Sequence, residues 1–248
     1  RLAGKVVTWL TVIRFSKTII TLCIPCSCMV SLADIRAAEL RIAEHVIRTP
    51  LVYSPAISAL TGARVYLKLE TLQKAGSFKV RGAGNKILAN ITAARTRGVV
   101  AASAGNHAQG VAVAAHAAGV QAMIVMPSWA SLAKQEATRR YGAEVVMDGS
   151  SLEESIRRAG ELAQEGRLFI HPYDDDDVIA GQGTIGLEIL HDLPGADIII
   201  VPVGGGGLIA GIAAAAKAIQ PGIRIIGAQA AACPSAYEAI GAGSPVRV

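Results

Sequence analysis

Aromatic residues, charged residues and cysteines are all scarce in this chain of 248 residues. Aromatic residues make up 4% of it and charged residues 17%, whereas hydrophobic residues make up 52%. The low charge and the high apolar content exclude a disordered protein and provide for a sizeable core. Three of the four cysteines lie before residue 29. The body of the chain therefore has no disulfide framework, and we expect a reducing, cytoplasmic location.

Acidic residues are absent from residues 1–28, and this absence accounts for most of the net charge of +5. Arg1, Lys5, Arg14 and Lys17 bring +4 to that segment, which leaves +1 for the remaining residues. No basic stripe suited to a phosphate backbone is left, so the sequence predicts no nucleic-acid partner. Uninterrupted apolar runs of the ~20 residues that a membrane helix needs are absent too, so no membrane partner is predicted.

Residues 1–28 also differ from the rest of the chain in composition. Cys23, Cys26 and Cys28 form a cluster, but no second cluster completes a four-ligand metal site. A signal peptide is the alternative, since basic residues precede apolar ones, yet two basic residues interrupt the apolar run. We expect residues 1–28 to be an extension that is unstructured or foreign to the protein, with the natural start near Met29.

Strand-like and helix-like segments alternate from residue 98 onward. In the first series, strands are predicted at 99–102, 122–126, 144–147 and 168–170, and helices at 106–118, 131–141 and 151–165. In the second series, helices are predicted at 184–191 and 208–219, and strands at 197–203 and 224–228. Strands separated by helical crossovers indicate mostly parallel, doubly wound α/β sheets.

The two series predict two α/β domains joined by a loop-rich segment near residues 172–180. A helix at 31–46, a strand at 65–69 and a helix ending at residue 89 precede them. We expect residues 29–97 and 172–248 to form a large domain and residues 98–171 a small one. A ligand is expected in the cleft between them.

Lys79 lies in a frame of small and aromatic residues that runs from Lys74 through Ser77 and Phe78 to Ala83. A protonated, hydrated lysine amine is a poor nucleophile. Desolvation lowers its pKa and suits it to Schiff-base chemistry with a carbonyl compound. On spacing alone, the alternative is a surface lysine beside a loop.

Gly204, Gly205, Gly206 and Gly207 follow an apolar strand and precede a helix. Consecutive glycines let backbone N–H groups curve around an anion, and the helix N-terminus favours negative charge. A dinucleotide-binding fold is the rival interpretation, but Gln229 stands near the position where that fold requires an acidic residue. We therefore expect this loop to bind a phosphate group.

A second strand-to-helix turn carries Ser103, Gly105, Asn106 and His107. Its hydroxyl and N–H groups at a helix N-terminus are suited to hold a carboxylate. Ser103 and Gly105 also match the end of the nucleophile elbow of α/β-hydrolases, but Ala101 replaces the first glycine of that motif. A serine hydrolase remains the alternative from another enzyme class. The run of acids at 174–177 is interpreted as a solvated loop.

These three motifs, in this order, resemble the fold-type II pyridoxal-phosphate (PLP) enzymes, also described as tryptophan synthase β-like. The likeness is greatest to the branch of threonine dehydratase (threonine ammonia-lyase) and serine racemase, and it covers residues 31–248. The resemblance implies PLP as cofactor, bound covalently by Lys79. The cofactor-binding residues that it implies are Phe78, Lys79, Asn106, Gly204, Gly205, Gly206, Gly207 and Leu208. Those implied for the substrate carboxylate are Ser103, Gly105, Asn106 and His107.

The resemblance further implies dehydration and deamination of L-threonine to 2-oxobutanoate and ammonia, or of L-serine to pyruvate and ammonia. The reaction would serve threonine catabolism or isoleucine biosynthesis. Serine racemase and serine dehydratase are the alternatives within the branch. Racemases of the branch carry a serine that returns a proton to the opposite face. Ala104 stands at that position here and favours dehydration.

Two further expectations follow from the resemblance. Gln229 and Pro234 stand where family members with a divalent metal carry acidic ligands, so no metal is expected. Family chains continue past this point with further strands and a serine-glycine-glycine segment. We therefore expect the C-terminal part to be missing, which leaves an inactive fragment as an alternative, and we expect a homo-oligomer at full length.

Overall fold

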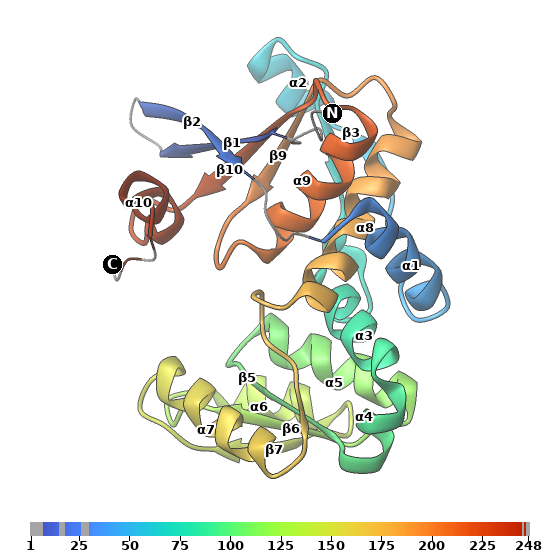
Figure 1. Ribbon diagram of the computed structural model, residues 1–248, viewed down its shortest axis with the longest axis vertical. Coiled ribbons are helices and arrows are strands. Elements are labelled where there is room, and N and C mark those ends of the chain that lie inside the picture. Colours follow the sequence, from blue (N-terminus) through green and yellow to red (C-terminus); the bar gives the residue numbers. More distant parts are fainter. Residues whose placement is uncertain (1–6, 15–17, 26–29, 245, 247–248) are drawn as a thin grey trace, which may run out of the picture. The chain divides into compact units, whose positions relative to one another are not determined.

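The computed structural model describes residues 7–14, 18–25, 30–244 and 246. Its contacts divide the chain into two compact units, which are both drawn in Figure 1. Unit 1 combines Arg1–Ala38 with Tyr173–Val248, and unit 2 is the continuous segment Glu39–Pro172. Each unit contains a sheet with parallel strands and the helices that connect them.

Unit 2 is built on four parallel strands in the order β7-β6-β5-β8. Their bounds are β5 Val99–Ala102, β6 Ala122–Met126, β7 Glu144–Met147 and β8 Leu168–Phe169. Every residue of β5 and β6 is buried, as expected for central strands of a parallel sheet. The strand order reverses between β5 and β8, so the carboxyl ends of these two strands form a topological switch point.

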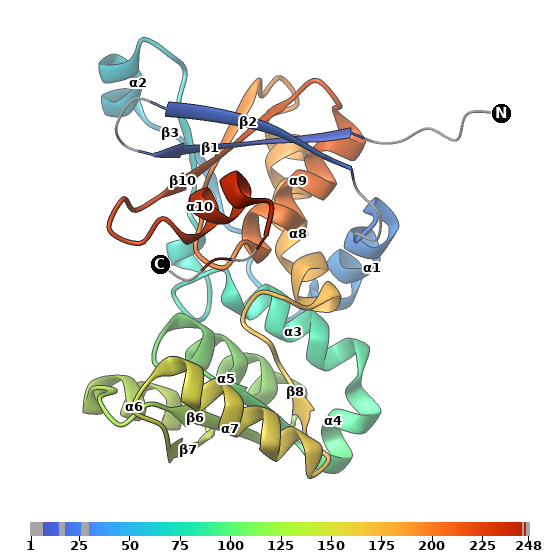
Figure 2. The ribbon, with the colours of Figure 1, turned by 60° about the vertical axis from the view of Figure 1, so that its left-hand side comes forward.

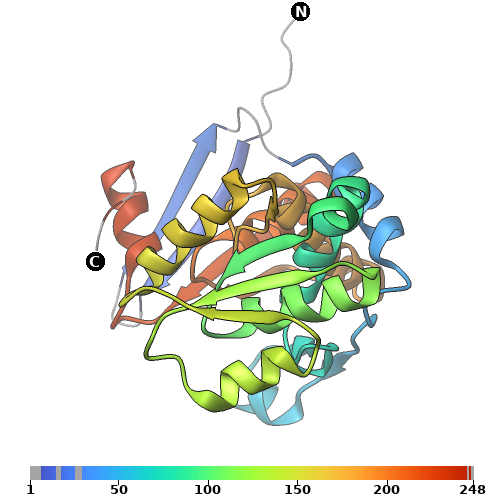
Figure 3. The same cartoon turned by 90° about the horizontal axis from the view of Figure 1, so that it is seen from below.

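Helices cover both faces of this sheet. The crossovers are α5 (Asn106–Ala118), α6 (Leu132–Arg139) and α7 (Leu152–Gln164). Because crossovers are right-handed, α7 returns on the face opposite to α5 and α6, and Figure 3 shows α7 in yellow on one side of the strands and α5 and α6, in green and yellow-green, on the other. The core under α7 joins Val100, Ala102 and Val125 of the strands to Ala159 and Leu162 of the helix.

The remaining elements of unit 2 precede the sheet in the sequence (Figure 2). They are the antiparallel pair β3 (Leu51–Tyr53) and β4 (Tyr66–Lys68), helix α2 (Pro55–Thr61), the 3-10 turn η1 (Glu70–Leu72), α3 (Lys79–Ala89) and α4 (Ile91–Arg97). Helix α3 packs against α5. A glycine allows that approach, since a Cβ at Gly110 would lie only 2.9 Å from the carbonyl carbon of Lys79.

Unit 1 contains a sheet in the order β2-β1-β10-β9. Its strands are β1 (Val7–Arg14), β2 (Thr18–Pro25), β9 (Ile198–Pro202) and β10 (Arg224–Gln229), and its helices are α8 (Asp176–Asp192), α9 (Gly207–Ile219) and α10 (Ser235–Ala242). Strand β9 alternates, with Ile199 and Val201 buried and Ile198 and Ile200 exposed. In Figure 1, α9 lies beside these strands and α8 beside α9.

Helix α1 (Leu32–Ile42) begins at a reciprocal cap. The backbone N–H and the hydroxyl of Ser31 donate to Asp34 Oδ2 at 2.9 and 2.6 Å, and Asp34 N–H donates back to Ser31 Oγ at 3.2 Å. Ile35 and Ala38 of α1 then join a core cluster with Ala180, Leu187 and Ala215 of α8 and α9. The sequence-predicted helix at 31–46 is confirmed, although it ends four residues earlier.

The structure differs from the sequence at the N-terminus. The sequence predicts an extension outside the fold for residues 1–28, whereas the structure forms the hairpin β1–β2 there and pairs β1 in parallel with β10. This pairing satisfies backbone groups along β10 that an open sheet edge would expose. Cys26, Cys28 and the expected start at Met29 lie outside the described residues.

The loop predicted over residues 172–180 is also wrong in part, because α8 already begins at Asp176. The side chain of Asp175 accepts the N–H of Val178 at 3.1 Å and so caps the helix. Asp176 and Asp177 follow in the first turn, where the helix dipole favours acidic residues. The acidic run is therefore a helix start and not a solvated loop.

The units meet the expectations for fold class, and the α/β fold with parallel sheets is confirmed. In the structure, residues 39–97 pack in the same unit as residues 98–172. The assignment of residues 29–97 to a large domain stays a prediction. No helix in the described part of the chain is both long and apolar enough to cross a membrane.

We predict that Gly211→Ala lowers the free energy of unfolding by about 1–3 kcal/mol, because a methyl group there would overlap α8. A Cβ at this position would lie 2.6 Å from the backbone nitrogen of Gly183. The matched control is Gly160→Ala in α7, where no atom lies within 4 Å of the added Cβ and alanine should be neutral or stabilising. Thermal unfolding of both variants checks the prediction, and equal melting temperatures would contradict it.

Candidate functional site

The switch point of the unit 2 sheet brings two loops together. One loop, residues 103–105, follows β5 and leads into α5, and the other, residues 170–172, follows β8. Ring atom Nε2 of His107 on α5 lies 2.9 Å from the carbonyl oxygen of Ile170, so a hydrogen bond joins the first turn of α5 to the loop after β8. Ligands of open α/β sheets bind outside the carboxyl ends of the strands at such a point.

Lys79 reaches this switch point from α3, of which it is the first residue. Its Nζ donates a hydrogen bond to the carbonyl oxygen of Pro172 at 2.6 Å, and it lies 5.3 Å from the centroid of the Phe78 ring. Gly110 of α5 leaves room for the backbone of Lys79, since a Cβ there would lie 2.9 Å from the Lys79 carbonyl carbon. The α3–α5 contact therefore places the amine beside the loop after β8.

Burial lowers the pKa of the Lys79 amine from 10.5 to about 8. The cause is desolvation, which disfavours the ammonium form relative to the neutral amine. A substantial fraction of the amine is then unprotonated near neutral pH, whereas an exposed lysine has almost none. Lys79 can therefore act as a nucleophile toward an aldehyde and, when free, as a base.

His107 lies in the same place but remains uncharged. Burial, followed by the positive charge of Lys79, lowers the pKa of its imidazole to about 3, although the hydrogen bond to Ile170 opposes the shift. A carbonyl oxygen only accepts, so Nε2 carries the proton and Nδ1 is a buried acceptor without a partner in the described part of the chain. The imidazole therefore offers a substrate carboxylate neither a charge nor a free N–H.

Ser103 lies in the turn before α5 and helps to fix that turn. Its hydroxyl oxygen accepts the N–H of Gly105 at 3.0 Å, which fixes the turn and leaves the hydroxyl hydrogen available to a ligand. Asn106, the first residue of α5, is exposed. N–H groups in a first helical turn have no carbonyl partner within the helix and attract negative charge. This turn can hold a carboxylate through main-chain N–H groups and the Ser103 hydroxyl.

The glycine loop lies in unit 1, between β9 and α9. Gly206 has φ 92°, in the left-handed region that favours glycine, and caps α9 without a side chain. A Cβ at Gly204 or Gly206 would meet no atom within 4 Å, whereas a Cβ at Gly205 would overlap the ring of Tyr173. Such a loop, open on one side and followed by a helix N-terminus, has room and N–H donors for a phosphate group.

The sequence-predicted site residues thus fall into two groups. Unit 2 holds Phe78, Lys79, Ser103, Gly105, Asn106 and His107, and unit 1 holds Gly204, Gly205, Gly206, Gly207 and Leu208. Within unit 2, the structure brings Lys79 and His107 to the same loop after β8. Sequence reasoning missed Pro172, Tyr173 and Gly110, and only Gly110, a glycine inside a helix, leaves a signal in the sequence.

Gln229 caps a helix in unit 1. Its Oε1 accepts the N–H groups of Ala236 and Tyr237, each at 3.1 Å, and its Nε2 donates to the Ser235 hydroxyl at 3.3 Å. The amide therefore holds the start of α10, and it carries no charge with which to bind a cation. The absence of a metal from this protein stays a prediction.

Comparison with protein families gives one match, to the family model described as pyridoxal-phosphate dependent enzyme, over residues 42–248. Among curated proteins, the chain is 49% identical over 221 residues to the L-threonine ammonia-lyase of Thermotoga maritima, with 89% of this chain and 55% of that protein covered. The chain spans little more than half the length of the curated relatives it matches.

Solved structures are also similar to the chain, among them a serine racemase and a threonine deaminase. Maize serine racemase matches with a TM-score of 0.85 and 40% identity over 89% of this chain and 68% of that one. The processed form of threonine deaminase isoform 2 from Solanum lycopersicum matches with a TM-score of 0.82 and 40% identity over 87% of this chain and 59% of that one.

We predict that Lys79 reacts with an aldehyde at a rate that rises with pH to a half-maximum near the pKa of about 8. Only the neutral amine attacks the aldehyde, so the rate falls below this pH as the amine is protonated. Reductive trapping at a series of pH values, followed by mass spectrometry of the peptide that contains Lys79, checks this. A lysine in a short unstructured peptide is the control, and a shared midpoint near 10.5 would contradict the prediction.

We also predict that Gly110→Ala weakens the binding of pyridoxal phosphate about tenfold or more, because the added methyl group would overlap Lys79 and such overpacking costs about 1–3 kcal/mol. The added Cβ would lie 2.9 Å from atoms of Lys79, so α3 must move. Gly84→Ala at the same helix contact is the control, because its Cβ would meet only atoms 3.9 Å away. Absorbance titrations measure both variants, and equal affinities would overturn the proposed role of Gly110.

Proposed function

Because the chain belongs to the family of pyridoxal-phosphate-dependent enzymes, we propose that the protein carrying it is a threonine ammonia-lyase. It splits L-threonine into 2-oxobutanoate and ammonia, and L-serine into pyruvate and ammonia. The water lost from the β-carbon is consumed again in the hydrolysis that releases ammonia, so the reaction balances. The observation that carries the proposal is the half-buried Lys79 amine at the switch point, with its lowered pKa.

Pyridoxal phosphate, when bound, supplies the electron sink that stabilises negative charge at the substrate α-carbon. Two observations support a fit of this cofactor to the residues present. Lys79 provides a nucleophilic amine for the aldehyde group, and the loop at 204–207 provides space and N–H groups for the phosphate. Phe78 beside Lys79 would contact the ring, and Asn106 would bond to its phenolic oxygen.

The chain's own groups have separate tasks in this proposal. Lys79 Nζ, once free, removes the proton from the substrate α-carbon, and the Pro172 carbonyl orients it. The N–H groups of the first turn of α5 and the Ser103 hydroxyl bind the substrate carboxylate. His107 contributes its backbone N–H and not its ring, since the imidazole is neutral and its Nε2 proton is engaged.

Ala104 decides between dehydration and racemisation in this proposal. Racemisation requires a second group that returns a proton to the opposite face of the α-carbon, and a methyl side chain cannot transfer one. A serine racemase is the second candidate because maize serine racemase is so similar in structure. A serine hydrolase has no comparable support, since the Ser103 hydroxyl accepts from Gly105 and His107 bonds to Ile170.

We further propose a cytoplasmic homo-oligomer that acts in threonine catabolism or isoleucine biosynthesis, takes a small amino acid as its substrate, and binds neither nucleic acid nor membrane. The composition supports the location, since one cysteine is found after residue 28. The charge of about +1 beyond that residue supports the absence of a nucleic-acid partner.

The test uses the protein expressed at its natural length with pyridoxal phosphate. We expect equal amounts of 2-oxobutanoate and ammonia from L-threonine, and a loss on the order of 1,000-fold or more in Lys79→Ala, because both nucleophile and base are removed. Ala104→Ser should raise the formation of D-serine from L-serine while the fold is retained. Turnover that survives Lys79→Ala, or D-serine as the main product of the parent, would overturn the proposal.

A further inference from the structure

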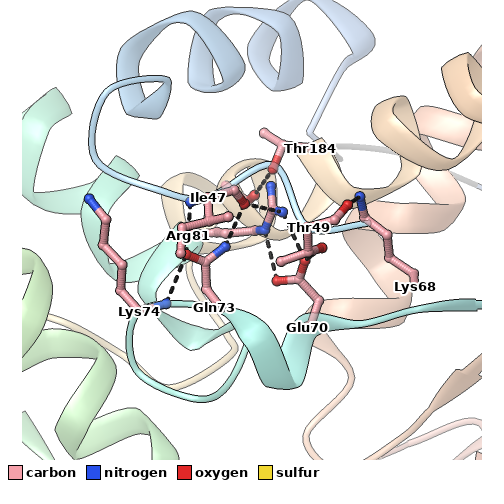
Figure 4. Close-up of polar contacts among 9 residues, drawn as sticks. Ile47, Thr49, Lys68, Glu70, Gln73, Lys74, Arg81 and Thr184 are labelled. Carbon is pink, nitrogen blue, oxygen red and sulfur yellow. Dashed lines mark hydrogen bonds and ion pairs between the residues drawn. The ribbon is translucent and has the colours of Figure 1, made fainter. Parts of the chain in front are cut away.

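Arg81 and Glu70 form a buried, bidentate ion pair next to the turn that leads into α3 at Lys79 (Figure 4). Nε of Arg81 donates to Oε2 of Glu70 at 2.9 Å, and Nη2 donates to Oε1 at 2.8 Å. The Arg81 side chain is 0% exposed and that of Glu70 is 14% exposed. The planar guanidinium fork fixes the orientation of both side chains, which a single ammonium group does not.

Further hydrogen bonds hold this pair on the segment before β3. Nη2 of Arg81 also donates to the carbonyl oxygen of Ile47 at 3.2 Å, and the hydroxyl of Thr49 donates to Oε1 of Glu70 at 2.5 Å. The amide of Gln73 bonds to both the N–H and the carbonyl of Ile47, at 2.9 and 2.8 Å. Figure 4 shows these side chains converging on the same point. The network therefore ties η1 and the first turn of α3 to one fixed segment.

The turn that carries Lys79 has few constraints of its own. Phe78 occupies the N-cap position of α3 without a side-chain cap, and the buried Ser77 hydroxyl has no partner in the described part of the chain. Gly76 has φ 65°, a conformation that glycine adopts without strain. The position of the first turn of α3 is therefore fixed by contacts with other segments. These are the hydrogen bonds of Arg81 and the contact of Lys79 with Gly110.

Stability alone does not account for a buried ion pair at this position. Well-packed apolar residues often replace such a pair with no loss of stability, because both charges must be removed from water. In some proteins, a buried polar or ionic pair instead specifies the register of the elements that it joins. The ion pair joins Glu70 of η1 to Arg81, the third residue of α3. It therefore connects the two ends of the segment that contains Phe78 and Lys79.

We propose that Arg81, oriented by Glu70, is a positioning residue for Lys79. It fixes the first turn of α3 so that the Lys79 amine reaches the Pro172 carbonyl and stays out of water. This inference rests on the role proposed for Lys79, and the experiment below separates the two.

The test compares the parent with three variants at the pair. Arg81→Met with Glu70→Met removes both charges, Arg81→Lys keeps the charge without the fork, and Glu70→Gln keeps the size without the charge. The control is Arg157→Met with Glu161→Met, which removes an exposed ion pair on α7. His107 is unchanged in all of them, and so is His171, which adds to the lowering of the His107 pKa by burial and by Lys79. The probe is pyridoxal phosphate, trapped by reduction and mapped by mass spectrometry as a function of pH.

We expect the parent and the control to be labelled at Lys79 with a midpoint near pH 8, set by the buried amine. In the double methionine variant at 70 and 81, we expect the fold to persist, as judged by circular dichroism. There the midpoint should rise by about one pH unit or more, since a displaced amine regains solvent. Arg81→Lys and Glu70→Gln should shift it in the same direction by a smaller amount.

Three results would overturn the inference. One is a folded double variant whose midpoint equals that of the parent. Another is an equal shift in the α7 control. The third is a loss of folding in all three variants at the pair, which would make the pair a requirement of the fold as a whole. Labelling of the parent at a lysine other than Lys79 would instead refute the role of Lys79, so the two failures are distinguishable.

Discussion

The burial of one primary amine constrains the rest of unit 2. Lys79 Nζ gives up much of its hydration and receives one carbonyl oxygen, that of Pro172, in return. This exchange requires α3 to approach α5 closely, which only a glycine at position 110 permits. It also requires the neighbouring imidazole of His107 to remain neutral, because a second buried cation beside the lysine would repel it. The switch point of the sheet supplies both carbonyl oxygens, at Ile170 and Pro172, from one loop.

Much of this fold could be predicted from the sequence because its signals are local. Short apolar runs predicted β5, β6 and β7 with the bounds that the structure has, and helical spacing predicted α5 likewise. Parallel pairing followed from the length of the crossovers. The family membership and the cofactor expected from the lysine frame and the glycine loop are confirmed at the level of the family.

What the sequence did not reveal depends on partners far away in the chain. The pairing of β1 with β10 joins segments from opposite ends of the chain in register, Leu10 with Ile225 for example, and no local pattern specifies it. The start of α8 was missed for a different reason, because an acidic run is equally compatible with a solvated loop and a helix cap. The Val178 N–H decides in favour of the cap, since it needs an acceptor and Asp175 supplies one.

The two motifs proposed to hold the cofactor differ in how their partners are encoded. Lys79 depends on a main-chain oxygen at Pro172, which every residue type would provide, so its partner leaves no trace in the sequence. The glycine loop depends on Tyr173, which follows Pro172 in the chain. The ring and backbone of Tyr173 fill the space where side chains at 205 and 207 would lie. Side chains are thereby excluded at positions 205 and 207, and φ 92° favours glycine at position 206, so a run of glycines is visible in the sequence. A contact that excludes side chains therefore leaves a recognisable run of glycines in the sequence, whereas a contact with a main-chain oxygen leaves no pattern there.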